Sequence, residues 1–364
     1  MRMTSWRRRA WLSLAASAAC TLLAGGTQAA PLQRIAFGIG DKAVSPLMIN
    51  RAIPEYLGYY KQEGLSVELV PVGSNAAIVA GLGSGRFQFG PGLAALQLPY
   101  LARGESFPGI DFLEVAYPGK FGIAVLPSSG ITSLSQLKGR KIGINNFSGA
   151  GYAIGQQMLR MSGVDPQKDV AWISVGEGIT PGIALQHGDI AALDYYDTGF
   201  GQIESAGIKL NYLQAPPNFP KVGNDYTMAA KEVLKDHRAW VVGIGRGILK
   251  AETFILANPE AAAWIYLQMY PEAAPKGMSV QDQVKAVMVP LVARMKLFVP
   301  YDKSMKWGTM RASDWQDEIN LAGLQDKVKD PSGLYTNALI DEMNDFDRAK
   351  IVEQARSFKL PYKQ

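Results

Sequence analysis

"GYYKQEGLSVELVPVGSNAAIVAGLGSGRFQFG", residues 58–90, is the stretch that decides the fold of this chain. Its residues 66–73 alternate in part between apolar and polar side chains, which predicts a strand. A helix is predicted next, with Ser74 or Asn75 at its N-cap and glycines at its end, and residues 86–92 predict a short strand. Strands that are separated by helices indicate a parallel sheet.

The same alternation begins upstream of this stretch and recurs in a second half of the chain. Residues 33–40 predict a buried strand, and residues 45–64 predict a helix that is interrupted near Pro54. Further on, "KIGINNFSGAGYAIGQQML", residues 141–159, predicts a strand, a glycine-rich turn and a helix. The other elements of the second half are a strand at 169–176, a helix capped by Thr180 with Pro181 in its first turn, and a strand at 189–197. The pattern predicts an α/β protein with two lobes, each with a strand–helix–strand–helix–strand plan.

Two connecting regions join the predicted lobes. Residues 114–139 contain a strand-like run and then a short helix capped by Thr132 or Ser133. Residues 209–230 contain three prolines that interrupt regular structure. Two crossings between lobes predict a hinge.

Beyond Lys231 the pattern becomes helical. Asn258 is a predicted N-cap with Pro259 at the first helical position, and residues 337–358 show the 3.6-residue spacing of one helix. We expect these helices to pack on the first lobe.

The N-terminus has the three parts of an export signal. Four arginines lie within the first nine residues, residues 11–23 are apolar, and "TQAA" at 27–30 offers a cleavage site, so that residues 1–29 are predicted to be removed. The run "RRAWL" at 8–12 also resembles a twin-arginine signal, which leaves the export route open. The residues "SAAC" at 17–20 lack the aliphatic residue of a lipoprotein cleavage box, so a lipid anchor at Cys20 is the minor interpretation.

Removal of the signal changes the charge of the chain. Four of the 37 basic residues leave with it, and the remaining 33 face 32 acidic residues, which does not indicate nucleic-acid binding. The single cysteine also leaves, so the mature chain has no thiol for disulfides, catalysis or metal binding. No apolar stretch of about 18 residues follows the signal, and we expect a soluble, periplasmic product.

The carboxyl ends of the predicted strands are the expected ligand site, because open parallel sheets bind ligands there. Ser74 and Ser148 each place a hydroxyl and backbone N–H groups at a helix start, which suits a carboxylate or sulfonate. The alternative is that each serine only caps its helix and contacts no ligand. Since neighbouring strand residues point to opposite faces, only one of Tyr195 and Tyr196 can face the cleft. The turns nominated by this rule are 41–45, 73–76 and 90–92 in the first lobe and 147–151, 176–180 and 194–199 in the second.

The predicted ligand-binding residues come from these turns. They are Asp41, Ser45, Gly73, Ser74, Asn75 and Gly90 in the first lobe, and Phe147, Ser148, Gly149, Ala150, Tyr195 and Asp197 in the second. The aspartates Asp41, Asp197 and Asp225 either receive an ammonium group or cap turns.

Catalysis and nucleotide binding find little support. The glycines at 149, 151 and 155 are spaced one residue wider than a dinucleotide fingerprint, and no acidic residue ends the next strand about 20 residues later. The chain has two histidines and none of the common hydrolase or Walker motifs. We therefore predict no catalytic residues, no cofactor and no metal.

Three stretches carry a resemblance to a known family. They are residues 58–90, "SGITSLSQLKGRKIGI" at 129–144 and "LRMSGVDPQKDVAWISV" at 159–175. In this order they resemble the periplasmic solute-binding proteins of ABC importers, in the nitrate, taurine, sulfonate and thiamine-precursor (NitT/TauT, SsuA/THI5-like) group, over roughly residues 35–213. Gln88 and Gln136 stand where that group often has aspartate.

The resemblance implies a type II periplasmic-binding-protein fold, whose lobes close around a small solute. It also implies an ABC permease and its ATPase as partners, no enzymatic activity, and a monomer. The expected boundaries are 31–117 with 225–364 for lobe one and its C-terminal helices, 118–215 for lobe two, and 216–224 for the hinge connection. The alternatives are an exported sensor or scavenger without a permease, and an enzyme similar to a thiamine-pyrimidine synthase.

Overall fold

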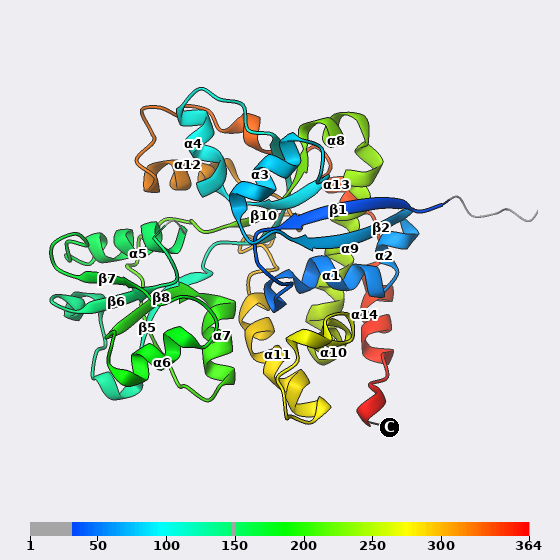
Figure 1. Ribbon diagram of the computed structural model, residues 1–364. Helices are drawn as coiled ribbons and strands as arrows, with labels where there is room; N and C mark the ends of the chain where they lie inside the picture. The colour runs from blue at the N-terminus through cyan, green and yellow to red at the C-terminus, as the bar shows by residue number, and fades with distance from the viewer. Residues whose placement is uncertain (1–30, 148–149, 364) are drawn as a thin grey trace, which may run out of the picture. The chain divides into compact units, whose positions relative to one another are not determined.

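The computed structural model describes residues 31–147 and 150–363, and it contains two five-stranded sheets (Figure 1). The strand order in the first sheet is β2-β1-β3-β10-β4. Its strands are β1 (Gln33–Ile39), β2 (Leu65–Pro71), β3 (Phe89–Gly92), β4 (Gly109–Ala116) and β10 (Asp225–Ala230). β10 is antiparallel to both of its neighbours, and the other four strands share one direction.

The second sheet repeats this plan with the order β7-β6-β8-β5-β9. Its strands are β5 (Phe121–Val125), β6 (Lys141–Ile144), β7 (Ala171–Ser174), β8 (Ala192–Tyr196) and β9 (Asn211–Leu213). Here β5 alone runs against the others. The antiparallel strand of each sheet, β5 or β10, is the first one formed after the chain has crossed from the other sheet. The predicted α/β architecture with two mainly parallel sheets is therefore confirmed.

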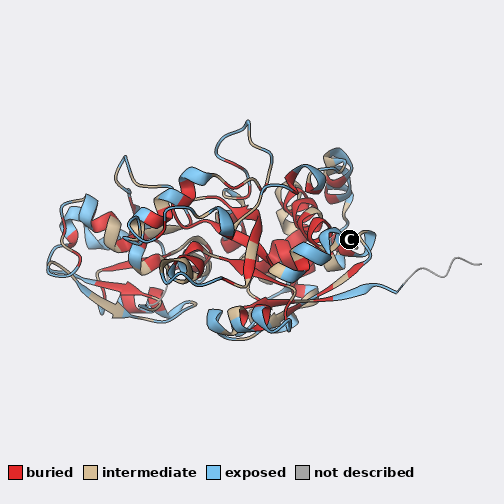
Figure 2. Ribbon diagram, turned by 90° about the horizontal axis from the view of Figure 1, so that it is seen from above, coloured by how far each residue is buried: buried red, intermediate tan, exposed pale blue. Residues whose placement is uncertain are grey.

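Helices flank the first sheet and include much of the C-terminal half. From the N-terminal half come α1 (Ile49–Tyr56), α2 (Tyr59–Gln62), α3 (Asn75–Gly83) and α4 (Ala94–Ala102); from the C-terminal half come α8 (Lys231–Asp236), α9 (Arg238–Ala257), α10 (Pro259–Met269), α13 (Ile340–Met343) and α14 (Arg348–Ser357). Most of α9 is buried, because it packs against α1, α2, α10 and α14. Figure 2 shows burial concentrated in the strands and on the inner sides of the helices.

The second sheet is flanked by α5 (Ala150–Met161), α6 (Thr180–His187) and α7 (Asp197–Ser205). Two C-terminal helices contact both halves of the molecule. α11 (Val280–Met295) packs against α7 and α10, and α12 (Ala312–Leu321) contacts α4 and α5. Short 3-10 helices lie at Pro46–Met48, Pro127–Ser129, Leu134–Leu137, Pro271–Ala273, Ser332–Leu334 and Pro361–Lys363.

Several predicted helix ends are confirmed by their caps. The Ser74 hydroxyl accepts the N–H of Ala77, and the Asn258 side chain accepts the N–H of Ala261. Ser133 rather than Thr132 caps the short helix, and Gln136 completes a capping box there. The side chain of Gln136 therefore stabilises the start of this short helix.

Other boundaries were wrong. α1 continues through Pro54 to Tyr56, and the break comes at Gly58, whose φ of 73° lies in the left-handed region that ends helices. Thr180 is the first residue of α6 and Ile179 is its N-cap, without a capping hydrogen bond.

The helix predicted at 337–358 is two helices, α13 and α14. Asp347 interrupts it, because its carboxylate accepts the N–H groups of Ala349 and Lys350 and so starts α14 anew. The pattern also missed β4, β10, α4 and α7. All six residues of β10 are buried, which removes the alternation that marks a half-exposed strand.

Candidate functional site

The carboxyl ends of the strands in the two sheets lie beside the two crossings of the chain. Ala116, the last residue of β4, pairs with Asp225, the first residue of β10. In the second sheet Phe121, the first residue of β5, pairs with Tyr196, the last residue of β8. The chain passes from β4 to β5 within five residues, so the edges that carry the predicted ligand residues meet at the crossings.

The first-lobe candidates occupy the turns after β1 and β2. Asp41 and Ser45 are half-buried, and Gly73, with a φ of 72°, leads into the exposed start of α3. Ser74 caps α3 through the 3.2 Å bond to Ala77, so the capping role proposed as its alternative is present. Two further candidates lie close to the strands. The Asn75 side chain packs over Gly40, and Gly90 is buried in β3.

The second-lobe candidates begin at the turn before α5. Phe147 is 55% exposed and packs edge-on against Tyr152, with the ring centroids 5.3 Å apart. Ala150 is the first residue of α5 and is half-buried. Ser148 and Gly149 lie outside the described residues.

The two tyrosines at the end of β8 have different surroundings. Tyr195 is 1% exposed and packs with Phe200 in the core of the second lobe. Tyr196 is partly exposed. Of the two, Tyr196 is therefore the one that reaches the surface at the carboxyl edge.

The Asp41 carboxyl group interacts with two other acidic side chains. Burial raises the pKa of its carboxyl group to about 6, and the carboxylates of Glu177 and Asp225 add to the rise. Glu177 lies in the turn between β7 and α6, so this repulsion acts between groups attached to different sheets. The two carboxylates provide acceptors for hydrogen-bond donors of a ligand.

A buried ionic network lies at the same junction. Arg294 of α11 donates from Nε and Nη2 to the two carboxylate oxygens of Asp197, each at 2.6 Å, and from Nη1 to Asp225 at 3.3 Å. Arg51 of α1 donates to Asp225 Oδ1 at 3.1 Å, and Lys120 Nζ lies 3.9 Å from Asp225 Oδ2. The Arg51 and Arg294 side chains are only 1% and 2% exposed. Asp197 begins α7 of the second lobe, so Arg294 links both lobes.

The charges in this network stabilise one another. Burial alone would raise the pKa of Asp225, but Lys120, Arg51 and Arg294 together lower it. Burial lowers the pKa of Lys120, and Asp225 opposes that change. Sequence reasoning nominated Asp197 as a ligand contact but did not find Arg294 as its partner. Nothing in the local sequence distinguishes Arg294 from any other arginine in a long helix.

The second crossing is held by α12. Asp317 accepts the N–H of Lys221 at 2.8 Å, and Glu318 accepts the N–H of Gly223 at 2.6 Å. Asn224 donates its amide to Glu114 of β4 at 2.6 Å. The first two bonds fix one end of the predicted hinge connection to a C-terminal helix, and the third fixes it to β4.

Neither histidine lies at the carboxyl edges. His187 is exposed at the end of α6, and the exposed His237 stacks on Trp240 with ring centroids 3.7 Å apart. Within residues 31–147 and 150–363, no group of three or more histidine, cysteine or acidic side chains is arranged to hold a metal. None of the helices described is both long and apolar enough to cross a membrane.

Comparisons with known proteins give one family and one fold. The family model described as "NMT1/THI5 like" matches residues 51–262. A 4-amino-5-hydroxymethyl-2-methylpyrimidine phosphate synthase of Legionella pneumophila is 21% identical over 231 residues, which cover 60% of this chain and 69% of that protein.

Two solved structures show the fold. The periplasmic aliphatic sulphonate binding protein SsuA from Escherichia coli is 14% identical with a TM-score of 0.61, and the match covers 85% of this chain and 91% of that one. The periplasmic nitrate-binding protein NrtA from Synechocystis PCC 6803 is 12% identical with a TM-score of 0.54, and the match covers 91% and 90%. The chain therefore has the two-lobed fold of periplasmic binding proteins.

Proposed function

Because the chain belongs to the NMT1/THI5-like family, we propose that it is the extracytoplasmic solute-binding component of an ABC-type importer. A small organic solute enters between the lobes, and the loaded protein delivers it to a membrane permease that works with an ATPase. The solute stabilises the closed arrangement by its higher affinity for that arrangement, and no bond is broken.

The observation that carries this proposal is that the side chains of Asp41, Glu177 and Tyr196, which are attached to different sheets, interact electrostatically. Asp41 follows β1 of the first sheet, whereas Glu177 and Tyr196 belong to the second. The pKa of the Asp41 carboxyl group is raised to about 6 by burial and by the charge of Glu177. A ligand placed between these groups contacts both lobes at once, which is the requirement for ligand-driven closure.

The same groups bear on the class of solute. Sulfonates, carboxylates and aromatic or pyrimidine-like molecules all remain within the proposal. Two carboxylates at the edge favour a solute that presents N–H donors, such as an aminopyrimidine, over nitrate or a sulfonate, because an anion would add to the repulsion.

Calorimetry with the mature protein tests this function. The panel contains 4-amino-5-hydroxymethyl-2-methylpyrimidine, an aromatic carboxylate, an alkanesulfonate and nitrate. We expect saturable binding of the pyrimidine with a tryptophan fluorescence change, and weaker or no binding of nitrate at the same site. Absence of binding to every member by a protein that melts cooperatively would contradict the proposal.

Asp41→Asn should raise thermal stability at pH 7.5. A carboxyl group whose folded pKa is about 6 instead of 3.8 binds its proton more tightly in the folded state. The folded protein therefore loses stability from this group as the pH rises from about 4 to 6, and the neutral amide removes that loss. We expect a gain of about 1–2 kcal/mol at pH 7.5 that disappears by pH 4.

Thermal melts of both proteins across this pH range measure the difference. Asp330→Asn is the matched control, since hydrogen bonds from Ser332 lower the pKa of the exposed Asp330 and its replacement brings no gain. A gain for Asp41→Asn that is independent of pH would show that the carboxyl group is not the cause.

An enzyme is the alternative from a different class, since the Legionella pneumophila relative is named as a synthase. Mass spectrometry of a bound solute after long incubation separates the two, because a binding protein returns it unchanged. A sensor or scavenger differs from a transport component only in lacking a permease, which genetic neighbours or a pull-down would reveal.

Export and assembly are also proposals. We propose that residues 1–29 are removed on export to the periplasm and that the mature protein is a monomer. We also propose that residues 31–117 with 225–364 and residues 118–215 are the two lobes, joined at 216–224. Cell fractionation with N-terminal sequencing and gel filtration test the first two statements.

A further inference from the structure

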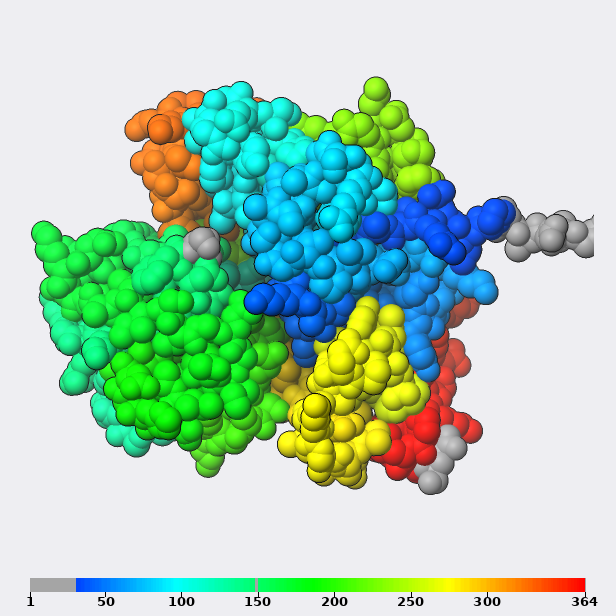
Figure 3. All heavy atoms as spheres, viewed as in Figure 1, coloured from blue at the N-terminus to red at the C-terminus, as the bar shows by residue number. Residues whose placement is uncertain are grey.

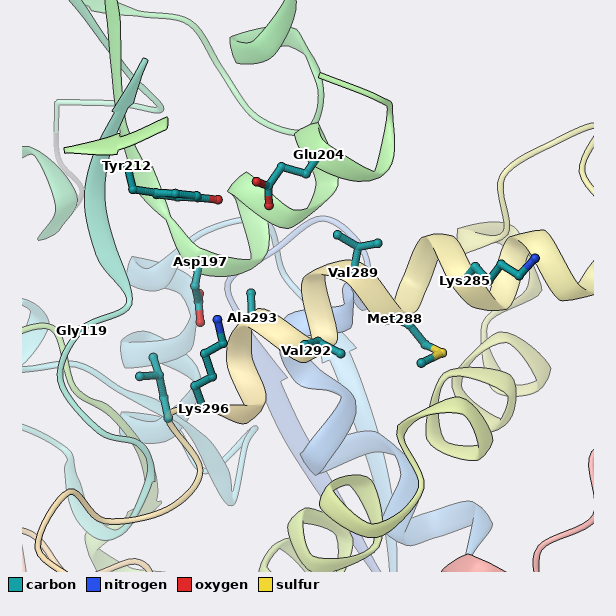
Figure 4. Close-up of a pocket in the computed structure, with 11 residues that line it drawn as sticks. Gly119, Asp197, Glu204, Tyr212, Lys285, Met288, Val289, Val292, Ala293 and Lys296 are labelled. Atoms are coloured by element: carbon teal, nitrogen blue, oxygen red, sulfur yellow. The ribbon is translucent and has the colours of Figure 1, made fainter. Parts of the chain in front are cut away.

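A cavity of about 810 Å³ is lined by Asp197 but by none of the other predicted ligand residues. Its walls come from α7 and β9 of the second lobe, from α11, and from Gly119 in the first crossing (Figure 4). Figure 3 shows the molecule hollowed between the green surface of the second lobe and the yellow segment that leads into α11. A volume of this size is within the range of small-molecule sites.

Apolar side chains that remain exposed to water line the cavity on two sides. Val289 and Val292 of α11 are 39% and 43% exposed, and Tyr212 of β9, which is 47% exposed, lies on the opposite side (Figure 4). Met288 and Leu297 are further apolar residues of the lining. Large apolar side chains that gather in a hollow and remain exposed mark a surface that gains free energy when an apolar body covers it.

The charged side chains around the cavity differ in whether they already have partners. Both oxygens of Asp197 accept hydrogen bonds from Arg294, and Lys285 pairs with Asp282 at 3.1 Å. Burial raises the pKa of Tyr212, and Glu204 raises it further through its charge and as a hydrogen-bond acceptor. Lys296 lines the cavity, and within the described part of the chain no carboxylate lies within ion-pair distance of its ammonium group.

We propose that this cavity binds a small amphiphilic monoanion, a carboxylate or sulfonate with an apolar chain. The chain lies along Val289, Val292 and Met288, and the anionic head meets Lys296. The site is separate from Asp41 and Ser74, and it shares Asp197 with the predicted ligand residues. Since its walls include both α7 and α11, its occupancy affects how these helices pack and hence the junction of the lobes.

Calorimetry with 1-octanesulfonate on the full mature protein tests the proposal, with octylammonium as the probe of opposite charge. We expect saturable binding of octanesulfonate and at least tenfold weaker binding of octylammonium. Lys296→Gln should lower the octanesulfonate affinity about tenfold, and Lys285→Gln should lower it less because Lys285 already has a partner.

Val292→Asp should abolish binding by placing a carboxylate among the apolar side chains of the lining. Val280→Asp is the matched control: Val280 begins the same helix, is 47% exposed and lies outside the cavity, so its variant should bind normally. Melting curves establish that both variants fold.

Three results would overturn the inference: no binding of octanesulfonate, equal or tighter binding of octylammonium, or binding that survives both Lys296→Gln and Val292→Asp. Asp41→Asn separates this inference from the proposed function. If Asp41→Asn changes octanesulfonate binding and Val292→Asp does not, the anion binds at the carboxyl edges, and the cavity proposal fails while solute binding stands.

Discussion

Arg294→Met lowers the free energy of unfolding by about 3–5 kcal/mol, the expected cost of removing one partner from a buried ion pair. The reason is the 2.6 Å pair of bonds from the guanidinium to Asp197, whose side chain is only 9% exposed. Methionine fills a similar volume but leaves the Asp197 carboxylate without its cation. Urea denaturation monitored by tryptophan fluorescence measures the loss.

Two further variants sharpen this result. Arg103→Met removes a surface pair, because Arg103 and Glu105 are 51% and 49% exposed, and should cost far less than Arg294→Met. Arg294→Lys should lie between, since an ammonium group keeps the charge but cannot form the two-pronged contact. Equal losses for Arg294→Met and Arg103→Met would show that the buried network contributes no more than a surface pair.

Gly201→Val is expected to destabilise the protein by about 1–3 kcal/mol, the usual cost of overpacking. Gly201 lies on α7 where this helix meets α11, and a Cβ atom added there would overlap the backbone of Pro290. A backbone cannot rotate out of the way as a flexible side chain can, so the two helices must separate. Denaturation measures the cost, and hydrogen exchange in α7 and α11 locates it.

Gly122→Val is the control for this prediction. Gly122 lies in β5, and a Cβ atom added there meets no heavy atom within 4 Å. Valine also suits a strand, so this variant should change stability by less than about 0.5 kcal/mol. If Gly201→Val matches that small effect, α7 and α11 do not pack as closely as the structure shows.

Both predictions concern contacts that no local pattern reveals. Sequence reasoning identified the helix cap Asn258 and narrowed two others to a pair of neighbouring residues that includes Ser74 or Ser133. This was possible because a cap and its partners lie within four residues of each other. The strands β1, β2, β6 and β8 were recognisable for a similar reason, as short apolar runs between turn residues. β10 was missed because a strand buried on both faces does not alternate.

The candidate site divides in the same way. Sequence reasoning nominated the turns at the carboxyl ends of the strands, because the carboxyl ends of parallel strands lie at the same edge of a sheet. It predicted that only one of Tyr195 and Tyr196 faces the cleft. In the structure Tyr195 is buried in the core and Tyr196 is partly exposed. It did not find Glu177 as the neighbour of Asp41, since the two are attached to different sheets.

The sequence by itself determined the α/β alternation, the two-fold repetition of its plan, the family resemblance and most caps, because these depend on residues close together along the chain. Tertiary structure decided which charges meet. Arg294 and Asp197 are 97 residues apart, and Arg51 and Asp225 are 174 apart. Only the packing of α1, α7 and α11 around the crossings brings these groups within hydrogen-bonding distance, and only burial there makes their pairing strong.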